Sequence, residues 1–122
     1  LAASGGTASR WPEGGPGGGD PLLALPVGLA SCAAVVAGDT GPLHVAGALG
    51  RPLVGLFGPT PRNAGFAVWT ERSAWLGGSS CSPCTLHGDH RCPRRHHDCL
   101  ESVTAGVVLA ALLDITDLRD AT

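Results

Sequence analysis

Lysine, methionine and tyrosine are absent from this chain of 122 residues, and all eight of its basic side chains are arginine. Charged residues make up only 15% of the chain, and the formal net charge is −2. Nucleic-acid binding needs a concentration of positive charge to neutralise phosphates, so this balance argues against a nucleic-acid partner. The chain begins at Leu1 without an initiator methionine, and we expect it to be a fragment of a longer protein.

A long hydrophobic run is also missing. The longest uncharged candidate, Pro21 to Gly38, just reaches the lower length limit for a membrane-spanning helix, and it contains Pro26 and Gly28. A short match to a lipoprotein cleavage site at residues 29–32 follows a glycine-rich segment that makes a poor signal peptide. We therefore expect neither a membrane span nor a leader here, and we expect a cytoplasmic protein.

Glycine and proline are abundant, with 19 and 10 residues, or about 24% of the chain. Residues 1–20 hold seven of the glycines and two of the prolines, so this segment is expected to be flexible or truncated. Residues 21–122 then form one domain, and the length leaves no room for two.

Two short apolar runs, at 32–37 and 52–57, are typical of strands that are buried on both faces. Between them, Asp39 or Thr40 is suited to cap a helix over residues 42–49, which Gly50 ends. A strand, a tight glycine loop, a helix and a second strand form a βαβ unit with parallel strands. The pattern thus predicts an α/β, Rossmann-like parallel sheet.

The rest of the chain gives weaker signals. Residues 22–30 indicate a short helix interrupted by Pro26, and residues 66–69 and 74–76 indicate short strands. Residues 102–113 are expected to form a C-terminal amphipathic helix. Its apolar face would consist of Val103, Val107, Val108, Ala111, Leu112 and Ile115.

The loop from Asp39 to His44 carries the clearest chemistry. It follows a strand and opens a helix, where ligands bind in open α/β sheets. The backbone N–H groups of Thr40, Gly41 and Leu43 and the helix dipole favour an anion, and glycine lets a phosphate approach closely. Asp39 is suited to accept hydrogen bonds from sugar hydroxyls, and His44 to donate one. A nucleotide sugar would satisfy all of these groups. The simpler alternative is that Asp39 only caps the helix.

An Asp-Thr-Gly sequence also resembles the catalytic loop of aspartic proteases, in which a dimer would supply Asp39 twice. The Pro42 that follows, and the helical pattern after it, are atypical of those enzymes.

Residues 35–60, VVAGDTGPLHVAGALGRPLVGLFGPT, resemble the signature of glycosyltransferase family 9, the ADP-heptose:lipopolysaccharide heptosyltransferase family. The likeness extends over about residues 22–115. It implies the GT-B fold, two Rossmann-like domains with the active site between them, and this chain is similar to part of the C-terminal, donor-binding domain.

The resemblance also implies roles for residues. Those in the donor-binding motif are Asp39, Thr40, Gly41, Pro42 and His44, and those in a donor-side loop are Gly58, Pro59 and Thr60. The catalytic base belongs to the missing N-terminal domain, so no catalytic residue is assigned. The donor would be an ADP-heptose-like nucleotide diphosphate sugar, and the acceptor lipid-linked or a lipopolysaccharide core. A position at the inner face of the cell membrane is therefore an alternative to free cytoplasm.

One motif departs from the family. Ser9-Arg10-Trp11-Pro12 stands where the family has Lys-Arg-Trp-Pro, whose lysine meets the diphosphate. The segment between Pro12 and Asp39 is also shorter than a complete domain would need.

Four cysteines, Cys81, Cys84, Cys92 and Cys99, lie within 19 residues among several histidines. Such spacing is suited to a tetrahedral zinc site, and a cytosolic setting favours metal or free thiols over disulfides. Two alternatives stay open: a cysteine-rich loop without metal, and a non-enzymatic zinc-binding module built on the four thiols. Cys32, in an apolar run, is expected to be a core residue.

Overall fold

The computed structural model describes residues 3–4, 7–8, 20–61, 70–87, 89 and 91–117. Its elements, in chain order, are β1 (Ala3–Ser4), β2 (Thr7–Ala8), α1 (Pro21–Ala30), β3 (Val35–Gly38), α2 (Gly41–Ala48), β4 (Leu53–Leu56), β5 (Ser73–Leu76), α3 (Asp98–Glu101) and α4 (Ala105–Ile115). None of the helices among these residues is both long and apolar enough to cross a membrane.

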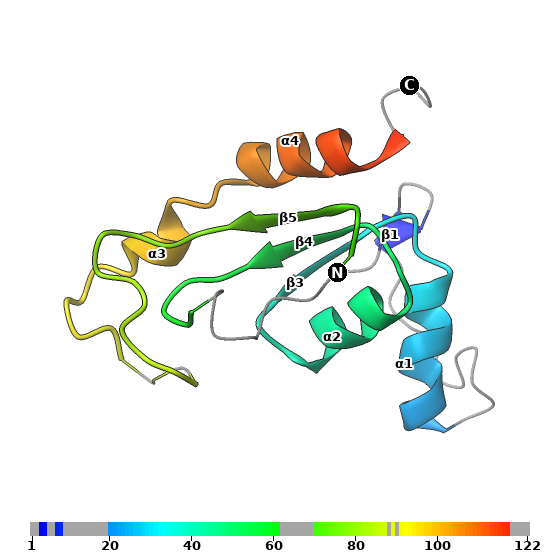
Figure 1. Ribbon diagram of the computed structural model, residues 1–122, viewed down its shortest axis with the longest axis horizontal. Helices are drawn as coiled ribbons and strands as arrows, with labels where there is room; N and C mark the ends of the chain where they lie inside the picture. The colour runs from blue at the N-terminus through cyan, green and yellow to red at the C-terminus, as the bar shows by residue number, and fades with distance from the viewer. Residues whose placement is uncertain are drawn as a thin grey trace.

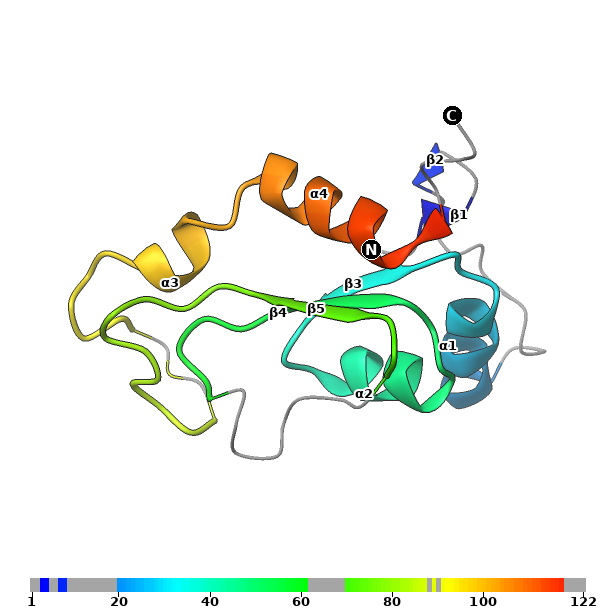
Figure 2. The same ribbon diagram turned by 45° about the horizontal axis from the view of Figure 1, so that its top comes forward.

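A parallel sheet in the order β3-β4-β5 forms the centre of the molecule. Helices α1 and α2 lie on one side of it and α4 lies on the other (Figures 1 and 2). This three-layer arrangement confirms the predicted α/β, Rossmann-like fold, with β3-α2-β4 as the βαβ unit. The short β1 and β2 pair with each other in antiparallel fashion, apart from the sheet.

The core lies between the sheet and the α1–α2 layer. Its buried residues are Leu29, Cys32, Val35, Leu43, Ala46, Leu53 and Phe57. The ring of Phe57 meets that of Trp75 edge to face, with the centroids 5.5 Å apart. Gly55 lies beneath Trp75, where a Cβ atom would overlap the indole ring. The absence of a side chain at Gly55 therefore allows the Trp75 ring to pack closely against the backbone of β4.

Helix α1 begins at a cap and is longer than predicted. The Asp20 carboxylate accepts a hydrogen bond from the Leu22 N–H at 2.9 Å. The expected break at Pro26 is wrong, because the helix continues to Ala30. The turn that ends α1 includes Cys32, whose thiol donates to the Gly28 carbonyl at 3.2 Å. For this reason β3 starts at Val35 and not at residue 32, although Cys32 is a core residue as predicted.

The central βαβ unit follows the prediction closely. Helix α2 begins one residue before the expected range, and Gly50, at a φ of 64°, follows its C-terminus. Strand β4 occupies the middle of the run predicted at 52–57, and β5 confirms the strand predicted at 74–76. The strand predicted at 66–69 lies outside the described residues.

The C-terminal helix differs from its prediction. The Thr104 hydroxyl caps α4 by accepting from the Val107 N–H, while residues 98–101 form the separate α3. Within the described chain α4 has no fully buried side chain, and Val107 and Leu109 are 45% and 56% exposed. Assigning Val107 to the inward face was wrong. Helix α4 lies across β4 and β5, so part of its apolar surface extends beyond the sheet.

Candidate functional site

The carboxyl ends of the three parallel strands are in register. Gly38 in β3 pairs with Leu56 in β4, and Leu56 pairs with Leu76 in β5. Three loops therefore leave the same edge of the sheet: residues 39–40, which lead into α2, residues 57–61 and residues 77–83. Open parallel sheets bind their ligands at this edge.

Asp39 and His44 face each other across the first turn of α2. Asp39 Oδ1 lies 4.0 Å from His44 Nε2, and the two side chains are 20% and 49% exposed. The carboxylate is an acceptor and the imidazole has a donor, and both are open to a molecule arriving from solvent. The structure thus brings these two predicted residues together.

The N-terminal end of α2 has the open backbone that the predicted phosphate-binding site requires. A Cβ atom at Gly41 would meet nothing within 4 Å, so a ligand has space to approach this backbone. Thr40 is the N-cap residue, but its hydroxyl makes no capping bond within the described chain and lies 3.3 Å from the Gly38 carbonyl oxygen. Pro42 has no N–H, and the Leu43 N–H donates to Thr40 O at 3.1 Å. The expected Leu43 donor is therefore already engaged.

The second predicted loop is tied to the cysteine-rich segment. The Pro59 carbonyl accepts hydrogen bonds from the N–H groups of Cys84 and Thr85, at 3.0 and 3.2 Å. A Cβ atom at Gly58 would come within 2.5 Å of the Leu100 side chain, so glycine allows close packing there. Pro59 and Thr60 line different cavities.

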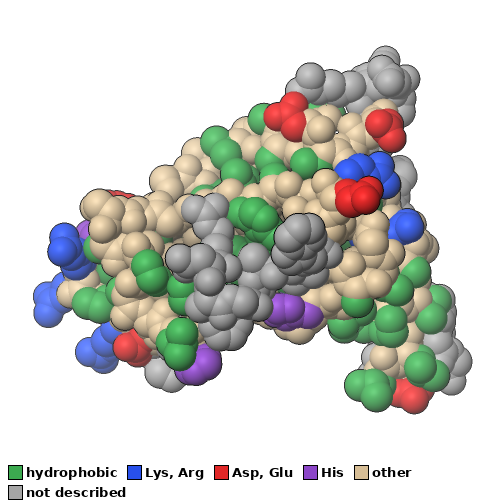
Figure 3. Space-filling model, viewed as in Figure 1, with side chains coloured by type: hydrophobic (Ala, Val, Ile, Leu, Met, Phe, Trp, Pro, Cys, Tyr) green, Lys and Arg blue, Asp and Glu red, His purple; other side chains and the backbone are tan. Residues whose placement is uncertain are grey.

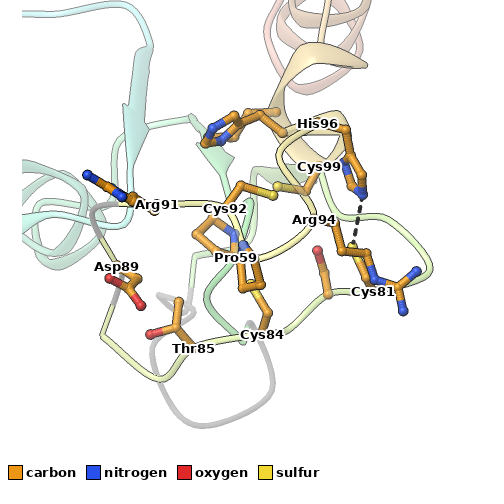
Figure 4. A pocket seen from close by; sticks show the side chains of 14 residues that line it. Pro59, Cys81, Cys84, Thr85, Asp89, Arg91, Cys92, Arg94, His96 and Cys99 are labelled. Carbon is orange, nitrogen blue, oxygen red and sulfur yellow. Dashed lines mark hydrogen bonds between the residues drawn. The ribbon is translucent and has the colours of Figure 1, made fainter.

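All four clustered cysteines line one cavity of about 270 Å³ (Figure 4). Cys81 Sγ lies 3.8 Å from His96 Nε2 and 3.1 Å from Ser79 Oγ. Backbone N–H groups of residues 94–97, that of His97 foremost, lower the pKa of the Cys92 thiol against the opposing effect of burial. Arginine side chains gather at this end of the molecule (Figure 3).

The cysteines are free thiols in the structure. Within the described residues, no three His, Cys, Asp or Glu side chains are grouped so that they could hold a metal ion. His90 lies outside those residues. Zinc at Cys81, Cys84, Cys92 and Cys99 therefore stays a prediction without support from geometry.

A second cavity, of about 540 Å³, lies between the loops that follow β4 and β5. Sequence reasoning missed it. Gly77 and Gly78 both have φ near 98°, a conformation that glycine adopts readily. The Gly-Gly-Ser-Ser run after an apolar segment was the signal that marked this turn.

The sequence model of the family described as glycosyltransferase family 9 (heptosyltransferase) matches residues 22–91 of this chain. The chain belongs to this family. It is similar to lipooligosaccharide heptosyltransferase 2 of Haemophilus influenzae, with 53% identity over 32 residues. That similarity covers 26% of this chain and 9% of the relative. No solved structure matches the chain.

The family match covers all three strand-end loops. Residues 39–44 and 58–60 lie inside it, with Cys81 and Cys84, whereas Cys92 and Cys99 lie beyond it. The match confirms the family resemblance, and the roles of single residues stay predictions.

Proposed function

We propose that this chain binds the nucleotide diphosphate sugar of a heptosyltransferase reaction, through the loop from Asp39 to His44. The observation that carries the proposal is the opposition of the Asp39 carboxylate and the His44 imidazole beside the open backbone at Gly41. Family membership supports a sugar-transfer reaction.

The chemistry assigns a different part of the donor to each group. The diphosphate would lie over Gly41 and Thr40, where the positive end of the α2 dipole favours negative charge. The Asp39 carboxylate would repel the diphosphate and is better suited to accept hydrogen bonds from sugar hydroxyls. His44 would donate to the donor from the first turn of α2. When the sugar leaves, the same helix end would stabilise the charge that develops on the diphosphate.

The transfer step needs more than this chain. In a GT-B arrangement, a second Rossmann-like domain supplies the catalytic base, so we assign no catalytic residue here. The named relative acts on lipooligosaccharide, and we propose an acceptor of that lipid-linked class. An enzyme with such an acceptor would work in the cytoplasm or at the inner face of the membrane.

Isothermal titration of the 122-residue chain with ADP-sugar tests the binding role. Asp39→Asn keeps the shape of the side chain and removes its charge, so the dissociation constant should rise by about tenfold or more, because hydrogen bonds to charged groups are stronger than neutral ones. Glu101→Gln, on the exposed surface of α3, is the matched control and should leave binding unchanged. Equal affinities of wild type and Asp39→Asn would refute the assignment.

Neither the aspartic-protease alternative nor the zinc-module alternative gains support. In the aspartic-protease alternative, the residues after Asp39 would continue as a strand, but α2 begins at Gly41. The zinc-module alternative predicts stoichiometric zinc that the fold requires, together with no nucleotide binding, and metal analysis of the purified chain would show it.

A further inference from the structure

The cavity lined by the four clustered cysteines plays no part in the proposed function. It has a volume of about 270 Å³. Its thiols differ in their access to solvent: Cys84 is exposed, Cys81 and Cys92 are half-buried, and Cys99 is buried, with 7% exposure. The reactions open to such a group of thiols depend on which of them a small molecule can reach, and on which second thiol lies beside the first.

The chain between Cys92 and Cys99 turns back on itself. The Arg95 N–H donates to the Cys92 carbonyl at 3.1 Å, and Arg95 and His97 have left-handed backbone, with φ of 61° and 56°. This conformation is unfavourable for a residue with a side chain, so two cases within three residues mark a constrained turn. The turn leads into α3, whose first turn carries Cys99. The side chains of Cys92 and Cys99 point toward each other in the cavity (Figure 4).

The same turn surrounds the Cys92 sulfur with hydrogen-bond donors. Backbone N–H groups of residues 94–97 contact the sulfur, that of His97 foremost. Successive N–H groups in such a turn form a concavity that holds an anion. The thiolate anion is the form of cysteine that attacks a disulfide, so Cys92 is suited to be the nucleophile of the pair.

The other two thiols are placed differently. The Cys81 sulfur lies 3.8 Å from His96 Nε2 and 3.1 Å from Ser79 Oγ. His96 Nδ1 accepts from the Asp98 N–H at 3.0 Å, so a neutral His96 carries its proton on Nε2 and donates it toward Cys81. Cys84 is exposed to solvent. The half-buried Cys92 and the buried Cys99 therefore remain as the pair of thiols that the fold sets against each other.

We propose that Cys92 and Cys99 form a redox-active dithiol whose substrate is a low-molecular-weight disulfide that carries carboxylates. Arg91 and Arg94 line the cavity and would attract those carboxylates, and Asp89 is the acidic side chain among its described lining residues. The site does not depend on the proposed function.

The reaction has two steps of thiol–disulfide exchange. The Cys92 thiolate attacks one sulfur of the small disulfide, which breaks the S–S bond, and the first small thiolate leaves. Cys99 then loses its proton to solvent and attacks the Cys92 sulfur. The Cys92–Cys99 bond forms and the second small thiolate leaves. Two protein thiols are thereby oxidised to a disulfide, and one small disulfide is reduced to two thiols.

Oxidised glutathione is the probe for this reaction. It is added to the folded 122-residue chain with EDTA present, so that no bound metal protects the thiols. The remaining free thiols are then alkylated, and the chain is digested with trypsin and mapped by mass spectrometry without reduction. Trypsin cleaves after Arg94 and Arg95, between the two cysteines, so the Cys92–Cys99 bridge leaves two peptides joined. We expect this joined pair as the main product. A bridge between Cys81 and Cys84 in its place, or all four thiols alkylated, would overturn the proposal.

The variant Cys99→Ser separates the two steps. Cys92 should still attack, but no second thiol follows, so glutathione should stay attached to Cys92. Cys92→Ser should abolish the bridge and leave the buried Cys99 reduced. Cys84→Ser is the matched control and should form the bridge in wild-type yield. Attachment of glutathione to Cys84 and not to Cys92 in the Cys99→Ser chain would contradict the assigned nucleophile.

The wild-type chain unfolded in urea shows whether the fold selects the pair. Without the turn and the cavity, the same oxidation should give a mixture of bridges, and the Cys92–Cys99 pairing should lose its lead. An equal share of this bridge in the folded and unfolded chains would mean that sequence spacing alone produces it, and would overturn the structural assignment. This comparison needs no variant, so it decides the proposal even where Cys99→Ser fails to fold.

Discussion

Asp39 Oδ1 lies 4.0 Å from His44 Nε2, so the first residue after β3 faces the first turn of α2. Both side chains stay partly exposed, although the strand and the helix that carry them belong to the buried centre of the fold. A rigid βαβ unit therefore holds an acceptor and a donor at an open edge, as a binding site requires.

The two threonine caps should differ in their contribution to stability. Thr104 accepts a hydrogen bond from the Val107 N–H, so Thr104→Ala should lower the free energy of unfolding by about 1 kcal/mol. Thr40 makes no capping bond within the described chain, and Thr40→Ala should cost clearly less. Urea denaturation of both variants measures the difference. Equal losses would mean that Thr40 caps α2 in solution.

Gly55 should tolerate no side chain. A methyl group there would overlap the Trp75 indole, and Gly55→Ala should destabilise the fold by about 1–3 kcal/mol, the usual cost of overpacking. Gly106→Ala is the control, because Gly106 lies in α4 with space around it, and alanine should stabilise that helix by about 0.5–1 kcal/mol. Thermal unfolding compares the two. A neutral Gly55→Ala would show that Trp75 does not pack on Gly55.

The Cys92 thiol should ionise at a lower pH than an ordinary thiol. Backbone N–H groups of residues 94–97 stabilise its thiolate form and lower its pKa. The midpoint of its alkylation by iodoacetamide, followed against pH by peptide mass spectrometry, should therefore lie below that of free N-acetylcysteine. The same residue in the urea-unfolded chain is the control and should lose the shift. Identical midpoints for folded and unfolded chains would contradict the N–H contacts.

Much of the fold could be predicted because its signals are local. Two apolar runs, a glycine loop and Gly50 predict the order of the βαβ unit and the position of its helix to within one residue. The start of β3 could not be predicted, because Cys32 belongs to one continuous apolar run and only tertiary packing assigns it to the end of α1. Val107 was misplaced for a similar reason, since the helical period shows a face but not how far the sheet extends beneath it.

The candidate site, like the fold, could be predicted only in part from the sequence. Asp39, Gly41 and His44 lie within six residues, and their chemistry could be read from the sequence. The cavity between the loops after β4 and β5 depends on Thr60 and Ser79, which lie on different loops, and only the register of β4 and β5 brings those loops together. Likewise, no spacing rule shows that Pro59 accepts hydrogen bonds from the cysteine-rich segment.

The most direct test of the central claim is a map of amide chemical shifts in the 122-residue chain during titration with ADP-sugar. We expect the largest saturable changes at the amides of residues 39–41 and 43–44, with smaller changes at the 57–61 loop. Pro42 gives no signal, because proline has no amide proton. The Asp39→Asn variant should shift the titration to higher ligand concentrations. Changes confined to residues 81–99, or no saturable change at all, would contradict the account.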